Sequence, residues 1–388
     1  MKILIASDLH YPAINGVATF SRNLAQGLAA RGHEVQVIAP SPTGKKWKEV
    51  DGNHIIVRTA SLPLPFFQNL RFSLAPGHEV KKAMNEFQPD IVHTQTPVAI
   101  SQAAIRYARK HGIPIVSTNH GMPENIMDNL KFLKPVSKPI SRMMEKFGAK
   151  LYSRANFITQ PTQSAIDMFK AEKIHVPMIA VSNGIDLKRF NHAPANPETY
   201  KKFNIPTSVP IVSYIGRLDA EKHISVLIRA FKRIKEAQSD AHLLIVGFGT
   251  DVPTLKALTK QLKLTKDVTF TGRVSDDEIV ELHKVGTVFC MPSPAELQSI
   301  AALEAMASGQ PIVAVDAGAL RELCQNGRNG YLCKQDNDKE IAAGLLKIIK
   351  DPKLRTKMSE ESLKIAGTHD LQTTLDKFEE IYTDLIKS

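Results

Sequence analysis

The chain has 388 residues, of which 43% are hydrophobic and 23% charged, a composition typical of a soluble globular protein with two or three domains. No apolar run approaches the roughly 18 residues of a membrane span, and the apolar stretch after Lys2 is too short for a signal peptide. The net charge of +11 lies entirely in residues 1–190, which hold 24 Lys and Arg against 13 Asp and Glu. Such an asymmetry indicates an anionic partner surface for the N-terminal half.

The first half of the chain alternates short apolar strands with helical patterns, which is typical of βαβ units and a parallel sheet. Strands are expected at 2–7, 34–39, 55–58, 91–93, 113–118 and 156–159. Between the first two strands we expect a helix whose apolar face consists of Val17, Phe20, Leu24 and Leu28. A Pro- and Asn-rich stretch at 191–206 then predicts the join to a second domain.

The second half repeats this plan. Strands are expected at 210–215, 241–246, 267–271, 287–291 and 311–315, with helices at 222–236, 251–264 and 275–284. The sequence therefore predicts an α/β fold with two doubly wound, Rossmann-like domains, residues 1–190 and 191–370, whose carboxyl strand ends face a cleft. A C-terminal helix at about 371–388 is expected to pack back onto the first domain.

Cysteine usage bears on the compartment and on metals. The chain has three cysteines, Cys290, Cys324 and Cys333, and none has the spacing of a metal site. An odd number of cysteines without such spacing is typical of a protein in a reducing cytoplasm. No acidic pair has metal-ligand spacing either, so the sequence predicts no metal.

The stretch 287–318 combines a strand, a proline-containing loop with Glu296, a helix at about 299–308 that carries Glu304, and a second strand. Eight residues at about 100° each place the two carboxylates roughly 80° apart, so they do not share one helix face. Between them lie the free N–H groups of the first helical turn, at 299–301, which form an anion site. Two carboxylates beside an anion site suit a phosphate with hydroxyl-bearing groups attached, as in a sugar nucleotide.

Two basic residues stand beside the start of the helix predicted at 222–236. Arg217 lies in the turn after a strand, and Lys222 lies at the helix start, where a positive side chain opposes the helix dipole. This placement favours a bound anion. The alternative is a structural ion pair of Arg217 with Asp219 or Glu221.

The first half offers a glycine and three histidines as further candidates. Gly16 precedes the first helix, where the absence of a Cβ lets the backbone approach a ligand, although glycine also suits any tight turn. His10, His93 and His120 each follow or end a strand, so they converge on the carboxyl edge of one sheet. One such histidine is more often structural, but three together favour a substrate contact, and His120 is the strongest candidate.

Short motifs spread along the chain carry a family resemblance. ELQSIAALEAMASGQPIVA runs from Glu296 through Glu304, GR precedes EK at Arg217 and Lys222, and NGV ends the first turn. Further motifs are GHEVQVIAP, SNGID, LIVGFG, VTFTGRV and DAGALRELCQNGRNGYL. Together they cover nearly the whole chain and resemble the family-4 retaining glycosyltransferases of GT-B fold. The SD…YPAINGV opening, DIVHTQTP at 90–97 and NHGMPEN at 119–125 resemble the branch that glycosylates membrane lipids, such as diacylglycerol or phosphatidylinositol.

The resemblance implies a pyrophosphate site. Arg217 and Lys222 are expected to bind the diphosphate, together with the backbone at Gly16 and the N–H groups near Ser299 and Ile300. Negative charge that develops on the β-phosphate would meet two cations and a helix N-terminus, which are preorganised for it. We therefore expect no metal and no other cofactor, the nucleotide sugar being a co-substrate.

Other positions are implied to contact the nucleoside and the sugar. Glu304 is expected to accept the ribose hydroxyls, and the backbone near Val274 to meet the base. The donor sugar is expected to be held by Glu296, the backbone of Leu297 and Gln298, and His120. The family usually has Gly where Ser299 stands and often Phe in place of Gln298, which bears on the identity of the donor sugar.

A basic segment follows at 131–154. Its basic residues recur every three or four positions and would form one stripe on a helix; they are Lys131, Lys134, Lys138, Arg142, Lys146, Lys150 and Arg154. Pro135 and Pro139 confine a regular helix to about residue 140 onward. The segment is either an ordinary solvated helix face or an interfacial helix on anionic lipid, and the charge of the first half favours the membrane. Lys45-Lys46-Trp47-Lys48 is a candidate second contact.

The sequence therefore predicts a retaining, metal-independent glycosyltransferase that moves a hexose from a nucleotide sugar, with UDP-glucose preferred, to a lipid hydroxyl such as that of diacylglycerol. It is expected to be cytoplasmic, peripheral on the inner face of the cell membrane, and to bind no nucleic acid, because no nucleic-acid-binding motif accompanies the basic segment. The alternatives are a soluble acceptor, GDP-mannose as donor, a basic nucleic-acid- or membrane-binding protein, and hydrolysis or epimerisation of sugar nucleotides. Same-face attack and double displacement through a carboxylate nucleophile both stay open.

Overall fold

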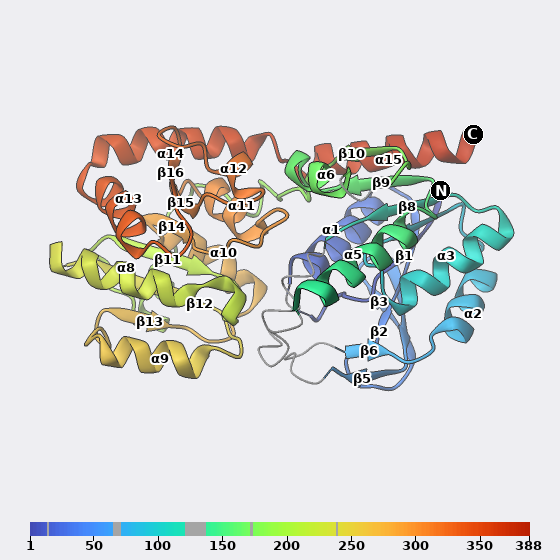
Figure 1. The fold of residues 1–388 in the computed structure, drawn as a ribbon, viewed down its shortest axis with the longest axis horizontal. Coiled ribbons are helices and arrows are strands. Elements are labelled where there is room, and N and C mark those ends of the chain that lie inside the picture. Colours follow the sequence, from blue (N-terminus) through green and yellow to red (C-terminus); the bar gives the residue numbers. More distant parts are fainter. Residues whose placement is uncertain (14, 65–70, 121–136, 171–173, 238–239) are drawn as a thin grey trace. The chain divides into compact units, whose positions relative to one another are not determined.

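The computed structural model describes the chain apart from residues 14, 65–70, 121–136, 171–173 and 238–239, and apart from the side chains of 137, 138 and 145. The chain divides into two compact units (Figure 1). Unit 1 consists of Met1–Asn183 with Gln372–Ser388, and unit 2 consists of Gly184–Leu371. Each unit is built on one large sheet flanked by helices.

The sheet of unit 1 has eight strands in the order β10-β9-β8-β7-β1-β2-β4-β3. Neighbouring strands are parallel except for the antiparallel edge pair β3 and β4. In chain order the strands are β1 (Lys2–Ala6), β2 (Glu34–Pro40), β3 (Trp47–Asp51), β4 (His54–Thr59), β7 (Ile91–Thr94), β8 (Ile115–Thr118), β9 (Phe157–Gln160) and β10 (Met178–Ala180). A separate antiparallel pair consists of β5 (Ser61–Pro63) and β6 (Arg71–Ser73).

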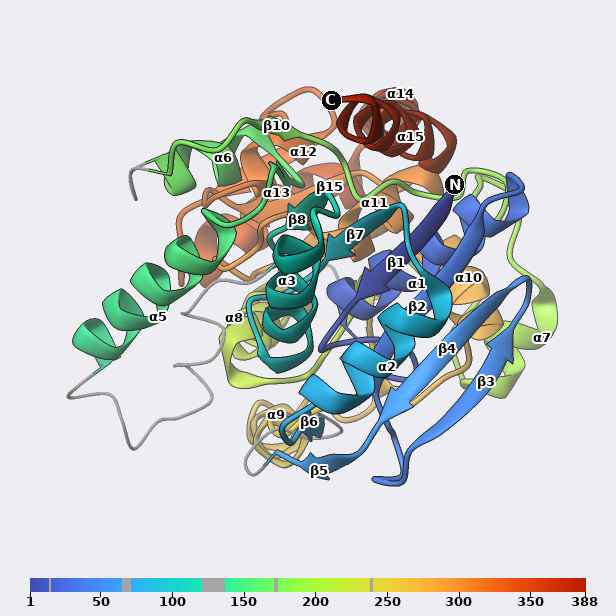
Figure 2. The same ribbon diagram turned by 90° about the vertical axis from the view of Figure 1, so that its right-hand side faces the viewer.

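Helices cover both faces of this sheet. They are α1 (Gly16–Ala30), α2 (Gly77–Phe87), α3 (Ala99–His111), α5 (Ser137–Tyr152), α6 (Gln163–Lys170) and α15 (Leu371–Lys387). Leu4 of β1 packs in a cluster with α2 and α3, which Figure 2 shows side by side. Ile5 and its neighbour His93 point to the opposite face, because side chains alternate along a strand. On that face His93 hydrogen-bonds to the Tyr382 hydroxyl of α15 at 2.6 Å.

The sheet of unit 2 has six parallel strands in the order β13-β12-β11-β14-β15-β16. They are β11 (Ile211–Ile215), β12 (His242–Val246), β13 (Val268–Phe270), β14 (Val288–Met291), β15 (Ile312–Val315) and β16 (Gly330–Cys333). The accompanying helices are α7 (Pro197–Lys202), α8 (Ile224–Ala237), α9 (Val252–Gln261), α10 (Asp276–Val285), α11 (Ile300–Ala307), α12 (Leu320–Leu323), α13 (Asp338–Lys350) and α14 (Pro352–Gly367). The strands are buried almost throughout, as expected when helices cover both faces of a parallel sheet.

The predicted α/β class with two Rossmann-like sheets is confirmed. Two predicted helix starts are wrong. The helix expected from residue 222 begins at Ile224, because His223 adopts a left-handed conformation (φ 51°) that ends the 3₁₀ turn η2 (Ala220–Lys222). The helix expected from about residue 140 begins at Ser137, so that Pro139 lies in its first turn, where its missing N–H costs no intrahelical hydrogen bond.

Among the residues that the structure describes, no helix is long and apolar enough to cross a bilayer.

Candidate active site

The loops that follow β11 and β14 of unit 2 bring two predicted site residues together. Lys222, at the end of the η2 turn, points at Glu296, and the distance from Nζ to Oε1 is 2.7 Å. The two side chains are only 13% and 12% exposed. Because carboxyl ends of parallel strands share one edge of a sheet, residues 74 positions apart form an ion pair here.

Arg217 is held by two carboxylates on its own loop. Its Nη1 donates to Asp219 and its Nη2 to Glu221, whose side chain is completely buried. Burial alone would lower the pKa of Arg217, but the Glu221 and Asp219 carboxylates outweigh it and raise the pKa. The ion pair that the sequence offered as the alternative for Arg217 is therefore present.

Asp219 also ties the loop after β11 to the loop after β12. Its Oδ1 accepts from the backbone N–H and the hydroxyl of Thr250, each at 2.8 Å. The two loops approach so closely that a Cβ on Gly249 would lie 2.2 Å from the Leu218 carbonyl oxygen. Gly249, in the segment Gly247-Phe248-Gly249, thus has a packing role.

The helix α11 begins as the sequence predicts. Ser299 is its N-cap, and the Ser299 hydroxyl accepts the Ala302 N–H at 3.3 Å. The N–H groups of Ile300 and Ala301 lie in the first turn, where an α-helix offers them no acceptor. Glu304 stands in the second turn, and its Oε2 lies 3.1 Å from Nε2 of His283 on α10.

Three further predicted contacts lie around this region of unit 2. Leu297 and Gln298 are buried, at 8% and 7% exposure, in the loop just before Ser299. Val274 is half-buried against the core and immediately precedes Ser275, the N-cap of α10. Their backbone groups, which the resemblance assigns to the sugar and the base, thus lie beside helix starts.

The formal charges of the Arg217 and Lys222 cluster decide how it can bind an anion. The two cations are accompanied by three carboxylates, those of Asp219, Glu221 and Glu296. The cluster therefore carries one more negative than positive charge. An anion that binds here has to take Lys222 or Arg217 from a carboxylate, so the positive charge available to it comes from an exchange of partners and from the N-terminus of α11.

The predicted residues of unit 1 lie at the carboxyl edge of its sheet. Gly16 is the first residue of α1, after the N-cap Asn15. His120 follows β8, and its Nε2 lies 2.8 Å from Oε1 of Gln95, which follows β7. Burial lowers the pKa of His120 to about 3, so the ring is neutral at ordinary pH. His120 can therefore hydrogen-bond to a hydroxyl but offers no charge to a phosphate.

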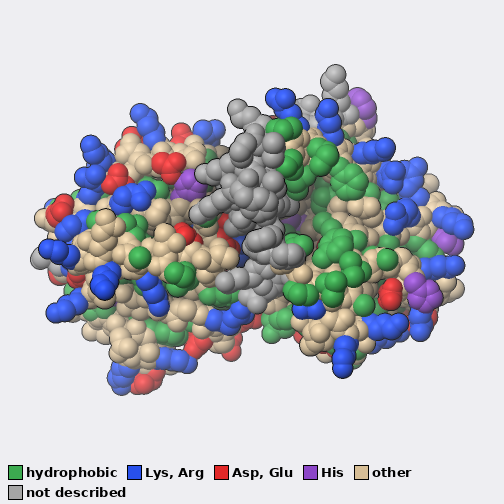
Figure 3. All heavy atoms as spheres, turned by 60° about the horizontal axis from the view of Figure 1, so that its bottom comes forward, with side chains coloured by type: hydrophobic (Ala, Val, Ile, Leu, Met, Phe, Trp, Pro, Cys, Tyr) green, Lys and Arg blue, Asp and Glu red, His purple; other side chains and the backbone are tan. Residues whose placement is uncertain are grey.

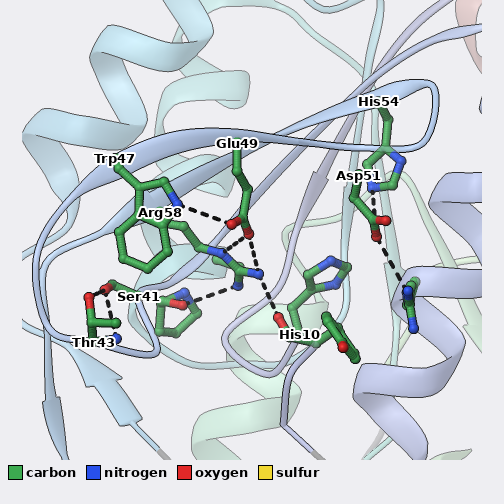
Figure 4. Close-up of polar contacts among 12 residues, drawn as sticks. His10, Ser41, Thr43, Trp47, Glu49, Asp51, His54 and Arg58 are labelled. Atoms are coloured by element: carbon green, nitrogen blue, oxygen red, sulfur yellow. Dashed lines mark hydrogen bonds and ion pairs between the residues drawn. The ribbon is translucent and has the colours of Figure 1, made fainter. Parts of the chain in front are cut away.

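One arginine, which holds the loop before Gly16, was not predicted from the sequence. Arg58 of β4 is 2% exposed, and it donates through Nη2 to the Tyr11 carbonyl at 2.6 Å and through Nε to Glu49 at 2.8 Å (Figure 4). Its Nη1 also donates to the carbonyl of Pro40. An arginine within the apolar strand HIIVRT was the available signal, because a buried charge needs such partners.

The predicted membrane residues are only partly described. Lys131 and Lys134, like the side chain of Lys138, lie outside the described residues. Arg142, Lys146 and Lys150 are exposed on α5, spaced four apart on one side of the helix. Beside them Met143 and Phe147 are 64% and 52% exposed, whereas Leu151 is buried in the core of unit 1.

Sequence comparisons cover most of the chain. Residues 14–189 match the family described as Glycosyltransferase Family 4, and residues 196–364 match the family described as Glycosyl transferases group 1. An alpha-monoglucosyldiacylglycerol synthase from Acholeplasma laidlawii is 26% identical, with 100% of this chain and 98% of that protein covered. A GDP-mannose-dependent alpha-mannosyltransferase from Mycolicibacterium smegmatis is 29% identical over 87% of this chain and 85% of that protein.

Solved structures show the same fold. Sucrose-phosphate synthase from Thermosynechococcus elongatus has a TM-score of 0.84 at 18% identity, with both chains covered completely. HepE from Anabaena in complex with UDP has a TM-score of 0.77 at 19% identity, covering 99% of this chain and 100% of that one. The two sheets and these likenesses define a GT-B fold.

The family follows from the sequence matches to both halves of the chain. The chain belongs to the family-4 glycosyltransferases, as its motifs suggested.

Proposed function

We propose that the chain transfers glucose from UDP-glucose to the hydroxyl of a membrane lipid such as diacylglycerol, with retention of configuration and without a metal. The family supplies the reaction class, and the Acholeplasma relative bears the name of a glucosyldiacylglycerol synthase. The enzyme would work as a peripheral protein on the inner face of the cell membrane.

In this proposal the Lys222–Glu296 pair opens when the donor arrives. Glu296 turns to the hydroxyls of the donor sugar, and Lys222 turns to the β-phosphate, where negative charge grows as the leaving group departs. Arg217 contributes from a fixed position, because Asp219 and Glu221 hold it. The first-turn N–H groups of α11 add a positive dipole end.

Two cations and a helix N-terminus would carry the leaving-group charge that a metal carries in other enzymes. Same-face attack fits this arrangement, with the departing phosphate taking the proton of the acceptor hydroxyl. Glu304 would accept the ribose hydroxyls and the Val274 backbone would meet the base. In unit 1 the roles proposed for Gly16 and His120 are a backbone contact to the pyrophosphate and a neutral hydrogen bond to the sugar.

The observation that carries the lipid acceptor is the exposed face of α5. Met143 and Phe147 are four residues apart and expose apolar surface beside Arg142, Lys146 and Lys150. Apolar side chains next to a basic row are typical of a helix that lies on anionic lipid. These two large exposed apolar side chains favour an interfacial helix over the alternative, an ordinary solvated helix face.

A second surface of unit 1 points the same way. Leu62 of β5 pairs with Phe72 of β6, so both point to one side of this two-stranded sheet, and Leu64 and Leu74 each follow directly after one of the two strands. All four are exposed, between 37% and 56%, whereas Ser61 and Ser73 on the other side are buried. Figure 3 shows hydrophobic side chains gathered on one face of unit 1. A sheet with its apolar side outward supports contact with a lipid.

The test incubates the protein with UDP-glucose or GDP-mannose, each with diacylglycerol in anionic vesicles or with a soluble glycan, and identifies products by mass. We expect a hexosyl-diacylglycerol from UDP-glucose, with the α linkage that retention gives. GDP-mannose is the second candidate donor, because the mannosyltransferase relatives reach 29% identity. Transfer only to the soluble acceptor would refute the lipid acceptor, and release of free hexose alone would refute transferase activity.

A further inference from the structure

His283 is a completely buried histidine that contacts a predicted substrate residue. It lies on α10, its side chain is 0% exposed, and its Nε2 is 3.1 Å from Oε2 of Glu304. Its Nδ1 has no hydrogen-bond partner in the described part of the chain. A buried imidazole nitrogen without a hydrogen bond costs free energy of folding. The polar contact that the described residues give this ring, to Glu304, therefore calls for an explanation.

The contact fixes which nitrogen carries the proton. A carboxylate only accepts hydrogen bonds, so Nε2 of His283 carries the hydrogen and donates it to Glu304. A proton on Nδ1 would have no acceptor there, because the ring stands edge-on to Phe190, with centroids 5.7 Å apart, and 6.1 Å from the ring of Phe289. The apolar surroundings thus leave one hydrogen bond, and it is directed at Glu304.

The backbone of His283 is itself held by a hydrogen bond from Gln310. Gln310 donates through Nε2 to the His283 carbonyl at 2.6 Å, and its Oε1 accepts from the Ser213 hydroxyl of β11 at 2.7 Å. Glu304 therefore stands at the end of a chain of hydrogen bonds that begins in the central sheet. Such support holds a side chain within the narrow range of geometry that ligand binding requires.

Only one carboxylate oxygen of Glu304 is used by this chain. Oε2 accepts from His283, and among the described residues Oε1 has no hydrogen-bond partner. The Glu304 side chain is 14% exposed, so it is neither fully buried nor free to move in water. This geometry leaves one oriented oxygen for a hydroxyl.

We infer that His283 is a positioning residue for nucleotide recognition, which fixes Glu304 so that its free oxygen accepts the ribose hydroxyls. This inference rests on the proposed role of Glu304. It predicts that His283 affects binding of nucleotides with ribose hydroxyls and not the binding of nucleotides that lack them.

The test measures, by calorimetry on the full chain, the affinities for UDP and for 2′,3′-dideoxy-UDP. GDP and 2′,3′-dideoxy-GDP are measured in parallel. His283→Phe keeps an aromatic ring but removes the donor, and we expect it to weaken UDP binding about tenfold. It should leave dideoxy-UDP within about twofold and raise KM for the donor more than it lowers kcat. His283→Gln, whose amide nitrogen reaches the position of Nε2, should restore most of the UDP affinity.

Glu304→Ala is the reference variant. If Glu304→Ala distinguishes the two nucleotides and His283→Phe weakens both equally, the histidine is merely structural and the inference is wrong. If Glu304→Ala itself fails to distinguish them, the ribose contact is absent and the inference fails with it. Should His283→Phe not fold, His283→Asn gives the same comparison, since its shorter amide does not reach the carboxylate.

Discussion

The ion pair between Lys222 and Glu296 makes a prediction in which binding and turnover change in opposite directions. Glu296→Gln keeps the shape of the side chain and removes its charge. If Lys222 must leave Glu296 to meet the diphosphate, the variant should bind UDP more tightly than the natural chain. Turnover should fall all the same, because the proposed contact between the carboxylate and the donor sugar is lost.

The size of the effect follows from the geometry. At 2.7 Å and an effective dielectric constant of about 20, the attraction between the two charges is roughly 6 kcal/mol before desolvation is subtracted. Hydrogen bonds to charged groups contribute about 1.5–3 kcal/mol net. If about half of this hydrogen-bond free energy opposes UDP binding in the natural chain, its loss in Glu296→Gln corresponds to a roughly tenfold lower Kd for UDP. The kcat of the variant should fall about 100-fold.

Calorimetry with UDP and steady-state kinetics with UDP-glucose measure the two quantities. Asp338→Asn is the matched control, because it removes one carboxylate of unit 2 that pairs with Arg233 at 2.7 Å and is 22% exposed. That variant should leave UDP affinity within about twofold. Unchanged or weaker UDP binding by Glu296→Gln would show that Lys222 does not exchange partners, and the reasoning from the charge of the cluster would be refuted.

Three further outcomes are expected. Lys222→Ala should lower kcat about 100-fold with a smaller change in donor affinity, since its partner charge grows in the transition state; wild-type turnover would contradict that role. Replacing Arg142, Lys146 and Lys150 together by Gln should weaken sedimentation with anionic vesicles about 100-fold, at about 1 kcal/mol each, while replacing exposed lysines of α14 in unit 2 should not. Burial, with the charges of Arg58, His54 and Arg22, lowers the pKa of His10 to about 3, and burial, with His120, lowers that of His93 likewise. Because both folded-state pKa values lie below the unfolded-state value of 6.5, the two neutral histidines stabilise the fold above pH 6.5. This contribution to the free energy of unfolding is lost as the pH falls, by about 2 kcal/mol for each histidine between pH 7 and 5. Urea unfolding followed by Trp47, the one tryptophan and a residue of unit 1, should show a lower midpoint at pH 5, and an equal midpoint would contradict the burial argument.

The central strands could be predicted from the sequence because their residues are apolar without interruption. Val288–Met291 and Ile312–Val315 are continuous apolar runs, and both are buried along their whole length. Edge and accessory strands lack that signal. In β5 and the residue after it, leucines alternate with a serine and a proline and point outward, and β16 begins with a glycine. Such short strands are defined by their neighbours, so local pattern does not identify them.

The residues of the candidate site could be predicted from the sequence, but the contacts between them could not. Glu296 and Glu304 fall on the loop and the helix as expected, and Ser299 caps α11. The pairing of Lys222 with Glu296 depends on two loops that converge only in the folded sheet. The contact of His283 with Glu304 depends in the same way on the packing of α10 against α11. A sequence shows which groups need partners, whereas the topology decides which partners they meet.

The two units use positive charge differently, and this difference explains why the excess lies in the first half. In unit 2 Arg217 and Lys222 already have carboxylate partners, so an anionic ligand has to displace one of these partners, which in the proposal above is the partner of Lys222. On α5 of unit 1 the side chains of Arg142, Lys146 and Lys150 are exposed, and within the described residues none has an acidic partner. Unpaired, solvated charge attracts any anionic surface over about a Debye length and weakens with salt. The excess charge of residues 1–190 therefore suits a surface of many lipids, and the compensated cluster of unit 2 suits one small molecule.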